Sequence, residues 1–253
     1  MAQPPTAHTG MGGLQAKMWA ELRANAGPST VPVTDIPGRL TRRPSSTNVT
    51  IDEYVAKHSD EFDRLLALDG PDGWDFNREE DGVKVYTMTC DGRNVPYFKA
   101  VTEVSVEGGL ARILHVLLHT EERPKWDEVC VKGSSEQHFP PFYKYTHTQS
   151  SSPAPMVSAR EMFTLGRYRF EPDGTFLWTL QSVDLDEFPP DPQFVRANLI
   201  DGGHIIRPKP GSTTDFTVTW TACIDPNGWV PKWVVNLKVT QQALVLAKAK
   251  AHF

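Results

Sequence analysis

Asp225-Pro226-Asn227-Gly228-Trp229-Val230-Pro231 begins the stretch that decides the fold, and the chain continues from there to Phe253. Gly228 marks a turn, and Pro231 suits the first position of a helix, where its missing N–H costs nothing. At about 100° per residue, the apolar side chains of this predicted helix form two stripes. They are Val230, Trp233, Val234, Leu237, Leu244 and Val245 on one stripe, and Val235, Val239, Leu246 and Phe253 on the other.

An ordinary surface helix has a single apolar face. A helix with two apolar stripes must contact apolar matter on both sides. We expect a sheet on one side, and a bound apolar ligand, a membrane or a partner on the other. The plainer alternative is a long helix that is buried within the protein's own core.

The composition limits the class of protein. The 253 residues suffice for one large domain or two small ones, and the formal net charge of −5 argues against an extended nucleic-acid footprint. No run approaches the roughly 18–20 apolar residues of a membrane span, and the N-terminus lacks the apolar stretch of a signal peptide. The cysteines suit a reducing compartment, because they are odd in number and far apart: Cys90, Cys130 and Cys223. We therefore expect a cytoplasmic protein.

Two regions can be separated along the chain. Residues 1–46 are rich in Pro, Gly, Ala, Ser and Thr, which is typical of a flexible N-terminal tail. The folded domain is predicted over residues 47–253. It starts with Thr50 as an N-cap and Glu53 three residues later, the pattern of a capping box, and helical spacing continues to Gly70.

Most of the folded domain is predicted to be strands, with a second amphipathic helix over 110–118. The predicted strands are Trp74–Arg78, Val83–Met88, Tyr97–Val106, Glu128–Lys132, Phe142–Thr148, Ala159–Phe170, Thr175–Val183, Phe194–Ile206 and Asp215–Ile224. Sequential antiparallel strands with helices at both ends predict an α+β domain. A strongly curved sheet that grips the terminal helix would cover both of its stripes.

The sequence shows no familiar catalytic machinery. His115 and His119 have the spacing of two metal ligands on a helix, but no further ligand cluster accompanies them. There is no phosphate loop ending in Lys-Ser/Thr and no Gly-x-Ser-x-Gly elbow. We therefore predict no catalytic residues, no metal site and no cofactor, and we expect that the protein is not an enzyme.

Several sequence blocks, in their order and spacing from about Ile51 to Phe253, resemble the StAR-related lipid-transfer (START) domain family. The blocks are Arg123–Asp127, Ser158–Phe163, Phe194–Ala197, Gly203–Pro208 and Asp225–Asn236. The resemblance implies a helix-grip fold, in which a curved antiparallel sheet of about nine strands surrounds a tunnel closed by the C-terminal helix. The loop Ser150–Val157 would be the Ω-loop beside that helix.

Within the family, the pattern is most similar to the phosphatidylcholine transfer protein branch. The resemblance implies that Arg123 and Asp127 hold the lipid phosphate and headgroup region, and that Tyr143 is a tunnel aromatic. The family's sterol carriers pair the arginine that corresponds to Arg160 with an acid on the preceding strand, but residues 139–148 contain no acid. A phospholipid is therefore favoured over a sterol. The remaining predicted lipid-binding residues are Met162, which stands where an aromatic is expected, and Trp178, Asn198, Trp233 and Leu237.

These observations predict a lipid-binding and transfer protein that encloses one lipid, a glycerophospholipid such as phosphatidylcholine, and carries it between membranes. We expect a monomer that touches membrane surfaces transiently and binds no nucleic acid. The alternatives are a START module that senses a sterol or another lipid without transporting it, and an enzyme on the same fold. At the residue level, Arg123 and Asp127 could instead form a plain surface pair, and Arg160 a buried structural arginine.

Overall fold

The computed structural model describes residues 40–41, 48–49, 58–89, 95–138, 143–184 and 188–253. The predicted capping box at Thr50 and Glu53 lies outside these residues, as does most of the predicted N-terminal tail. A pair of two-residue strands, β1 and β2, is described from that part of the chain: Leu40–Thr41 and Asn48–Val49.

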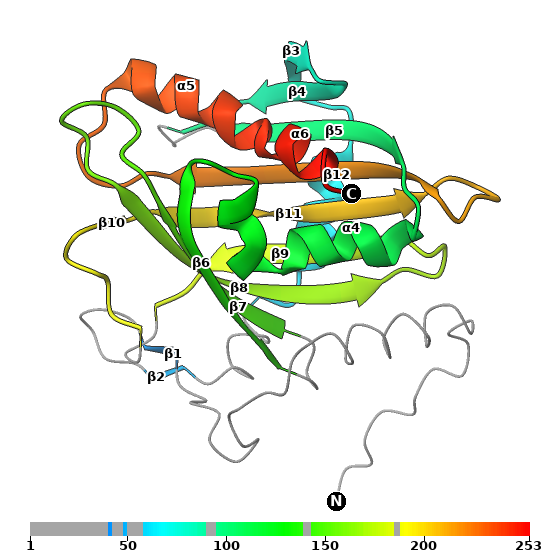
Figure 1. Ribbon diagram of the computed structural model, residues 1–253, viewed down its shortest axis with the longest axis horizontal. Helices are drawn as coiled ribbons and strands as arrows, with labels where there is room; N and C mark the ends of the chain where they lie inside the picture. Colours follow the sequence, from blue (N-terminus) through cyan, green and yellow to red (C-terminus); the bar gives the residue numbers. More distant parts are fainter. Residues whose placement is uncertain (1–39, 42–47, 50–57, 90–94, 139–142, 185–187) are drawn as a thin grey trace, which may run out of the picture.

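The central feature is a large antiparallel sheet in the order β3-β4-β5-β12-β11-β9-β8-β7-β6 (Figure 1). A short tenth strand, β10, pairs in parallel with β8. The bounds are β3 Asp75–Glu80, β4 Val83–Met88, β5 Tyr97–Ser105, β6 Cys130–His138, β7 Tyr143–Ser150, β8 Arg160–Phe170, β9 Phe176–Ser182, β10 Val195–Arg196, β11 Asn198–Pro208 and β12 Asp215–Asp225. The predicted helix-grip architecture, with its antiparallel sheet of about nine strands, is confirmed.

Two predicted strands differ from the observed ones. The strand predicted over 128–132 begins later and runs much further, as Cys130–His138. Its polar residues have a low intrinsic preference for the strand conformation. The segment is a strand because it pairs with β7 along its whole length. The strand predicted over 194–206 is divided at Ala197 into β10 and β11, because the first part pairs with β8 and the second with β12 and β9.

The helices lie on both faces of the sheet. They are α3 Glu61–Asp69, α4 Gly109–Leu118, the 3₁₀ helix η2 Thr120–Lys125, α5 Lys232–Ala243 and α6 Val245–Lys250. The last two cross the face that also carries α4 (Figure 1), whereas α3 packs on the other face through Phe62 and Leu65 against Leu177 and Ile205. The predicted single C-terminal helix is therefore two consecutive helices that meet at Leu244.

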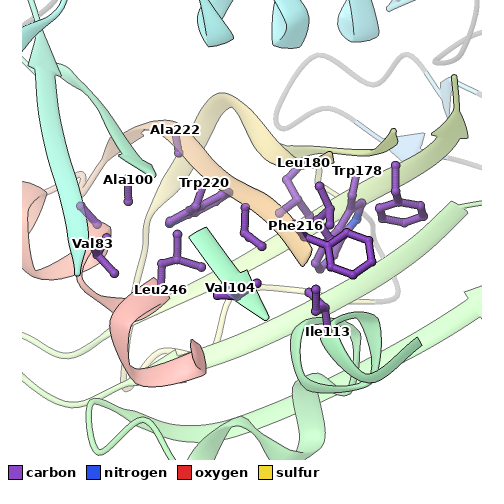
Figure 2. Close-up of a cluster of buried hydrophobic side chains, with 14 of the residues drawn as sticks. Val83, Ala100, Val104, Ile113, Trp178, Leu180, Phe216, Trp220, Ala222 and Leu246 are labelled. Carbon is purple, nitrogen blue, oxygen red and sulfur yellow. The ribbon is translucent and has the colours of Figure 1, made fainter. Parts of the chain in front are cut away.

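The main core lies between the sheet and the helices α4, α5 and α6. Side chains from the central strands converge there with Ile113 of α4 and Leu246 of α6 (Figure 2). Strand β12 supplies Phe216, Val218, Trp220 and Ala222 to this core, as its predicted alternation requires. No helix in the described part of the chain is long and apolar enough to cross a membrane.

Candidate functional site

A cavity of about 530 Å³ lies between the C-terminal helices and the sheet. Its apolar walls include Val234, Val235 and Val239 of α5 on one side, and Phe98, Met162 and Ile224 of the sheet on the other. The side chains that α5 turns toward the sheet are short, branched valines, which leave space that a longer side chain would fill. The volume falls within the roughly 300–1,000 Å³ that small-molecule pockets span.

A buried carboxylate forms the charged part of the cavity wall. Asp127 accepts a hydrogen bond from Arg123 Nε at Oδ2 (3.0 Å) and another from Lys248 Nζ at Oδ1 (3.2 Å). Its side chain is 1% exposed. Burial opposes ionisation, but the charges and hydrogen bonds of Arg123 and Lys248 hold the pKa of Asp127 below its ordinary value. The ionised carboxylate thus ties η2 to α6 beside the cavity.

Lys238 of α5 brings a further cation to this wall. Among the described residues, no acceptor lies within hydrogen-bond or ion-pair distance of its ammonium group. Burial, and then repulsion from Lys248, lower the pKa of Lys238. A half-buried ammonium without a close partner is a place where an anionic ligand group would gain a charge-assisted hydrogen bond.

Arg160 lines the same cavity, but its guanidinium group donates hydrogen bonds to backbone carbonyls. Its Nε donates to the Pro226 carbonyl (3.1 Å), one Nη donates to the Asn227 carbonyl (2.9 Å), and the other donates to the Ser158 carbonyl. Arg160 therefore joins the loop that precedes β8 to the turn that precedes α5. The alternative of a buried structural arginine describes this geometry well.

A second, smaller cavity of about 70 Å³ adjoins the first, since Arg123, Met162 and Gln242 line both. Its floor is formed by sheet residues that include Trp178, His204 and Trp220, and its cover by Leu246 and Ala249 of α6. We name this space the inner chamber. Figure 2 shows Trp178 and Trp220 on the sheet and Leu246 on the helix that covers it.

The aromatic rings of the inner chamber form one stack. His204 lies directly opposite Trp178 of β9 and Trp220 of β12 in the strand register. Its ring is stacked on both indoles, with centroid distances of 5.2 Å to Trp178 and 4.4 Å to Trp220. Burial, and then the nearby Arg123 charge, lower the pKa of His204 to about 3, so that the imidazole is neutral at physiological pH.

The profile of the START domain matches residues 57–252. The chain belongs to the START domain family. Among solved structures, human StAR-related lipid transfer protein 5 superposes with a TM-score of 0.67 at 21% sequence identity, covering 80% of this chain and 97% of that one. This likeness shows that the two share a fold.

Two curated relatives extend the comparison. START domain-containing protein 10 of Mus musculus is 26% identical over 166 residues, which are 65% of this chain and 55% of that protein. The acetyl-coenzyme A thioesterase of Rattus norvegicus is 26% identical over 183 residues, 67% of this chain but 30% of the enzyme. The similarity thus spans about half of the first relative and under a third of the second.

Within this START domain, part of the predicted site is assembled around the cavities. Arg123, Asp127, Arg160 and Met162 line the large cavity, and Trp178 lines the inner chamber. The structure places these residues on η2, the turn after it, β8 and β9. The sequence blocks that carry the family resemblance therefore meet at one place.

The other predicted residues lie elsewhere. Tyr143 is buried and packs against Tyr145, but it lines neither cavity. Thr148, on the same strand, does line them, and Tyr143 is five residues away, roughly 17 Å along the strand. Asn198 is exposed at the start of β11, Trp233 is 62% exposed on α5, and neither lines a cavity. The side chain of Leu237 lies outside the described part of the structure.

The sequence reasoning missed three residues of the site: Lys238, Lys248 and His204. Lys238 follows Val234 and Val235 at helical spacing, so the sequence places a lysine within an apolar stripe of the helix. This position could have identified Lys238 as a candidate site residue. His204 stands between glycine and isoleucine in a buried strand, where a titratable residue is unusual. Lys248 gave no such signal, because its role depends on Asp127 more than a hundred residues away.

Large apolar side chains are exposed beside the large cavity. Met156, in the loop before β8, is 96% exposed, and Trp229, in the turn before α5, is 72% exposed. Arg160 connects these two segments through its bonds to Ser158 and Asn227. Exposed apolar groups of this size mark contact surfaces when they gather on neighbouring segments.

The predicted histidine pair has ordinary local partners. His119 Nδ1 lies 2.8 Å from the His115 carbonyl, and His115 Nε2 lies 3.6 Å from Glu122. Across the described residues, no group of three or more His, Cys, Asp or Glu side chains is arranged to hold a metal ion.

Proposed function

We propose that this START domain encloses one lipid in its large cavity and carries it between membranes. The observation that carries the proposal is the cavity itself, which has apolar walls from α5 and the sheet and a charged wall at Asp127. Apolar walls suit hydrocarbon, and a few polar groups at one end suit a headgroup. The relatives named for lipid transfer support the same conclusion.

The proposed ligand class is a glycerophospholipid, such as the phosphatidylcholine that the sequence resemblance suggests. Asp127 is already neutralised by Arg123 and Lys248, while Lys238 keeps its donors available. Lys238 is therefore a cation of the cavity wall without a close acceptor among the described residues. A lipid phosphate would supply acceptor oxygens for its ammonium group. The choice of choline as the headgroup rests on the resemblance alone.

Transfer, rather than very tight capture, follows from the energetics. Moving a methylene from water to an apolar site is worth about 0.8 kcal/mol, so about thirty of them would exceed the practical ceiling on affinity. The acyl chains of a lipid in a bilayer are already out of contact with water. Their free energy in the bilayer is therefore close to their free energy in the cavity. The protein then mainly lowers the barrier to leaving the membrane, and the polar groups decide which lipid leaves.

The cavity must widen to hold two full acyl chains. A methylene takes up about as much volume as a water molecule, so thirty methylenes need roughly 900 Å³. The cavity has a volume of about 530 Å³. The wall proposed to move is α5 with α6, because these two helices cover the cavity over the sheet. We propose that these helices and the loop 150–157 open when a lipid enters or leaves.

The proposed carrier works at the cytoplasmic surface of membranes, as a monomer that touches them only transiently. The exposed Met156 and Trp229, joined by the Trp233 side chain on α5, would enter the interfacial region of the bilayer. They lie on the segments that border the cavity opening proposed above. Membrane contact and opening would therefore occur at the same place.

Extraction and transfer assays test the proposal directly. Protein purified from cells is examined by native mass spectrometry, and its lipid is identified after extraction. Fluorescent phospholipid transfer between donor and acceptor liposomes is then measured. We expect one bound lipid per chain and transfer above the spontaneous rate. Protein that is empty and extracts nothing from liposomes contradicts the proposal, and extraction without transfer indicates a lipid sensor instead.

Two lysine variants test the charged wall. Lys238→Gln should lower extraction of phospholipids about tenfold, because a charge-assisted hydrogen bond to the phosphate is lost. Lys84→Gln makes the same change in charge at an exposed position of β4 that lines neither cavity, and it should extract like the wild type. Equal losses in both variants would mean that overall charge, not the cavity, controls extraction.

The proposal includes no enzymatic step. The similarity to an acetyl-coenzyme A thioesterase concerns under a third of that enzyme. Incubation with acetyl-coenzyme A, followed by a free-thiol assay, should show no release above background. Release that depends on the folded protein would replace the carrier proposal with an enzyme that uses the cavity as a reaction chamber.

A further inference from the structure

Lys238 is the cation of the large cavity that the protein leaves without an acceptor. Among the described residues, no acceptor lies within hydrogen-bond or ion-pair distance of its ammonium group. The other positively charged side chains of the described lining each have one: Arg78, Arg123, Arg160 and Lys248. An anionic group of a ligand would therefore complete the bonding of this part of the wall.

A second donor lies beside Lys238 on the same helix. Gln242 follows it by four residues on α5, and side chains at this spacing are neighbours on one helix face. Gln242 also lines the cavity, and its amide nitrogen donates two hydrogen bonds. A carboxylate or a phosphate has two or more acceptor oxygens, so one oxygen suits the ammonium group and another the amide. The two residues together form a donor pair for an anion.

The lining is poorly matched to a positively charged headgroup. Its buried carboxylates, Asp127 and Glu161, are both already bonded. Glu161 accepts three hydrogen bonds of 2.9 Å, which come from His147 Nε2, Arg196 Nε and the Asp191 backbone N–H. The other carboxylates of the lining are exposed to solvent: Glu80, Asp81 and Glu128.

Aromatic faces, the alternative partners of a quaternary ammonium group, are also scarce. Phe98 is the single aromatic side chain in the described lining of the large cavity, and it is 1% exposed. A cage for a quaternary ammonium group is built from several aromatic faces, and these are absent from the described lining. A choline headgroup would therefore place its phosphate well and its cation badly.

The volume of the cavity suits one hydrocarbon chain. A methylene takes up about as much volume as a water molecule, so about 530 Å³ holds roughly eighteen groups of that size. A phospholipid with two full acyl chains has about thirty methylenes and needs the walls to move apart. A single chain of about 16–18 carbons fits the space as it stands. Apolar walls on both sides suit such a chain.

We infer that the large cavity, at its volume of about 530 Å³, binds a single-chain anionic lipid whose carboxylate or phosphate is held by Lys238 and Gln242. A long-chain fatty acid and a lysophosphatidic acid share this chemistry. The inference goes beyond the proposed function, because it adds a ligand that needs neither a wider cavity nor a transfer step. It makes Lys238 the specificity-determining residue for the charge of the ligand.

Ligands with one identical chain test the role of charge. The full chain is stripped of co-purified lipid and incubated with oleate, 1-oleoyl lysophosphatidic acid, 1-oleoyl lysophosphatidylcholine and methyl oleate, below the concentrations at which they form micelles. Native mass spectrometry measures which of them is bound. The two anions should bind at least about tenfold more tightly than the zwitterionic and neutral ligands. Equal binding of all four overturns the inference.

Substitution of Lys238 tests the assigned residue. Lys238→Gln should weaken the binding of both anions about tenfold and leave that of methyl oleate unchanged. Lys238→Arg keeps the charge and should keep most of the affinity. Lys84→Gln changes the net charge equally at an exposed position outside both cavities, and it should bind like the wild type. A loss for methyl oleate as large as that for oleate overturns the assignment.

A chain-length series on the wild type covers the case in which a variant does not fold. Saturated fatty acids of 10 to 22 carbons are compared in the same assay. Each added methylene should tighten binding roughly threefold to fourfold until the cavity is full, at about 16–18 carbons. Longer chains should gain nothing or bind more weakly. A constant gain up to 22 carbons, or no dependence on length, overturns the fit to one chain.

A vesicle experiment separates this inference from the proposed carrier function. The protein is incubated with vesicles that contain oleate and dioleoyl phosphatidic acid in equal amounts, and the lipid it holds is quantified. An excess of oleate supports the single-chain ligand. An excess of the two-chain lipid overturns the inference and upholds the enclosure of a phospholipid. Binding of oleate by a protein that transfers no phospholipid supports the inference and contradicts the carrier function, and a protein that binds neither lipid contradicts both.

Discussion

The two faces of the central strands differ in how closely side chains pack against them. On the face toward α3, Leu65, Leu177 and Ile205 are at most 1% exposed, and ion pairs bridge the layer at 2.7 Å (Glu61 with Arg167) and 2.8 Å (Asp69 with Arg207). On the face toward α5 and α6, the same strands border two cavities.

The difference shows how one sheet separates stability from binding. Alternate side chains of a strand point to opposite faces, so each strand can contribute to a filled layer and to a hollow one. The filled layer gains the free energy of close packing, which the hollow layer gives up. The hollow layer leaves the space that a ligand would occupy. Changes on the two faces should therefore have separable effects on stability and on lipid binding.

The largest effect on stability is expected for Leu65→Ala on the filled face. Truncation of a fully buried leucine should lower the free energy of unfolding by about 3 kcal/mol, since the close packing leaves a cavity behind. Leu199→Ala is the matched change on the face of the cavities, because Leu199 is also 1% exposed and lines the inner chamber. It should cost less, about 2 kcal/mol, because its side chain already borders space. Urea unfolding measures both. Equal losses would contradict the contrast between the faces.

A smaller effect is expected for Asp127→Asn on the hollow face. The change leaves Arg123 and Lys248 without their buried partner and should cost about 2 kcal/mol at pH 7, since both cations are partly exposed. The carboxylate's folded pKa lies below 3.8, so its contribution is present above pH 3.8 and lost as the pH falls further. The variant and the wild type should therefore converge in acid.

The control for this prediction is Glu128→Gln. Glu128 also pairs with Lys248, but its side chain is 76% exposed. A pair of this kind contributes little, so the loss should stay below about 0.5 kcal/mol. Similar losses for the two variants would mean that burial of Asp127 does not set the strength of the pair.

His204 should make stability depend on pH. Its pKa is 6.5 in an unfolded chain and about 3 in the folded protein, so the unfolded state binds more protons between these values. The contribution of the neutral His204 to the free energy of unfolding is therefore fully present well above pH 6.5 and decreases as the pH falls. At pH 5.5 the loss is about 1.4 kcal/mol. His204→Gln should remove this part of the slope, whereas His252→Gln at an exposed position should not. An unchanged slope in His204→Gln contradicts a neutral, buried imidazole.

The smallest effect on stability is expected at the exposed tryptophans. Trp229→Ser and Trp233→Ser should change the free energy of unfolding by no more than about 0.5 kcal/mol, because both rings are mostly in solvent. Their effect should appear in the liposome assay, where transfer slows several-fold while the amount of bound lipid is unchanged. Normal transfer by the double variant would remove these residues from the proposed membrane contact.

Local sequence pattern predicted most of the architecture. The clean alternation of β12 placed Phe216, Val218, Trp220 and Ala222 on one face, and these side chains do form part of the main core. Helical spacing located α4 to within one residue at its start. The pattern failed at β6, where polar residues form a strand because β7 lies beside them. It failed again at Leu244, where the predicted single helix is divided in two.

The sequence by itself determined the fold class, the family and the apolar character of the C-terminal stretch, because these depend on local spacing and on motifs that can be read in order. Only the tertiary structure decided which residues line the cavities. Trp233 and Val234 are neighbours on one predicted stripe, yet one is exposed and the other fully buried. Lys238 and His204 reach the cavities from α5 and β11. Whether a side chain is satisfied depends on groups distant in sequence, and that information exists only once the sheet and helices have come together.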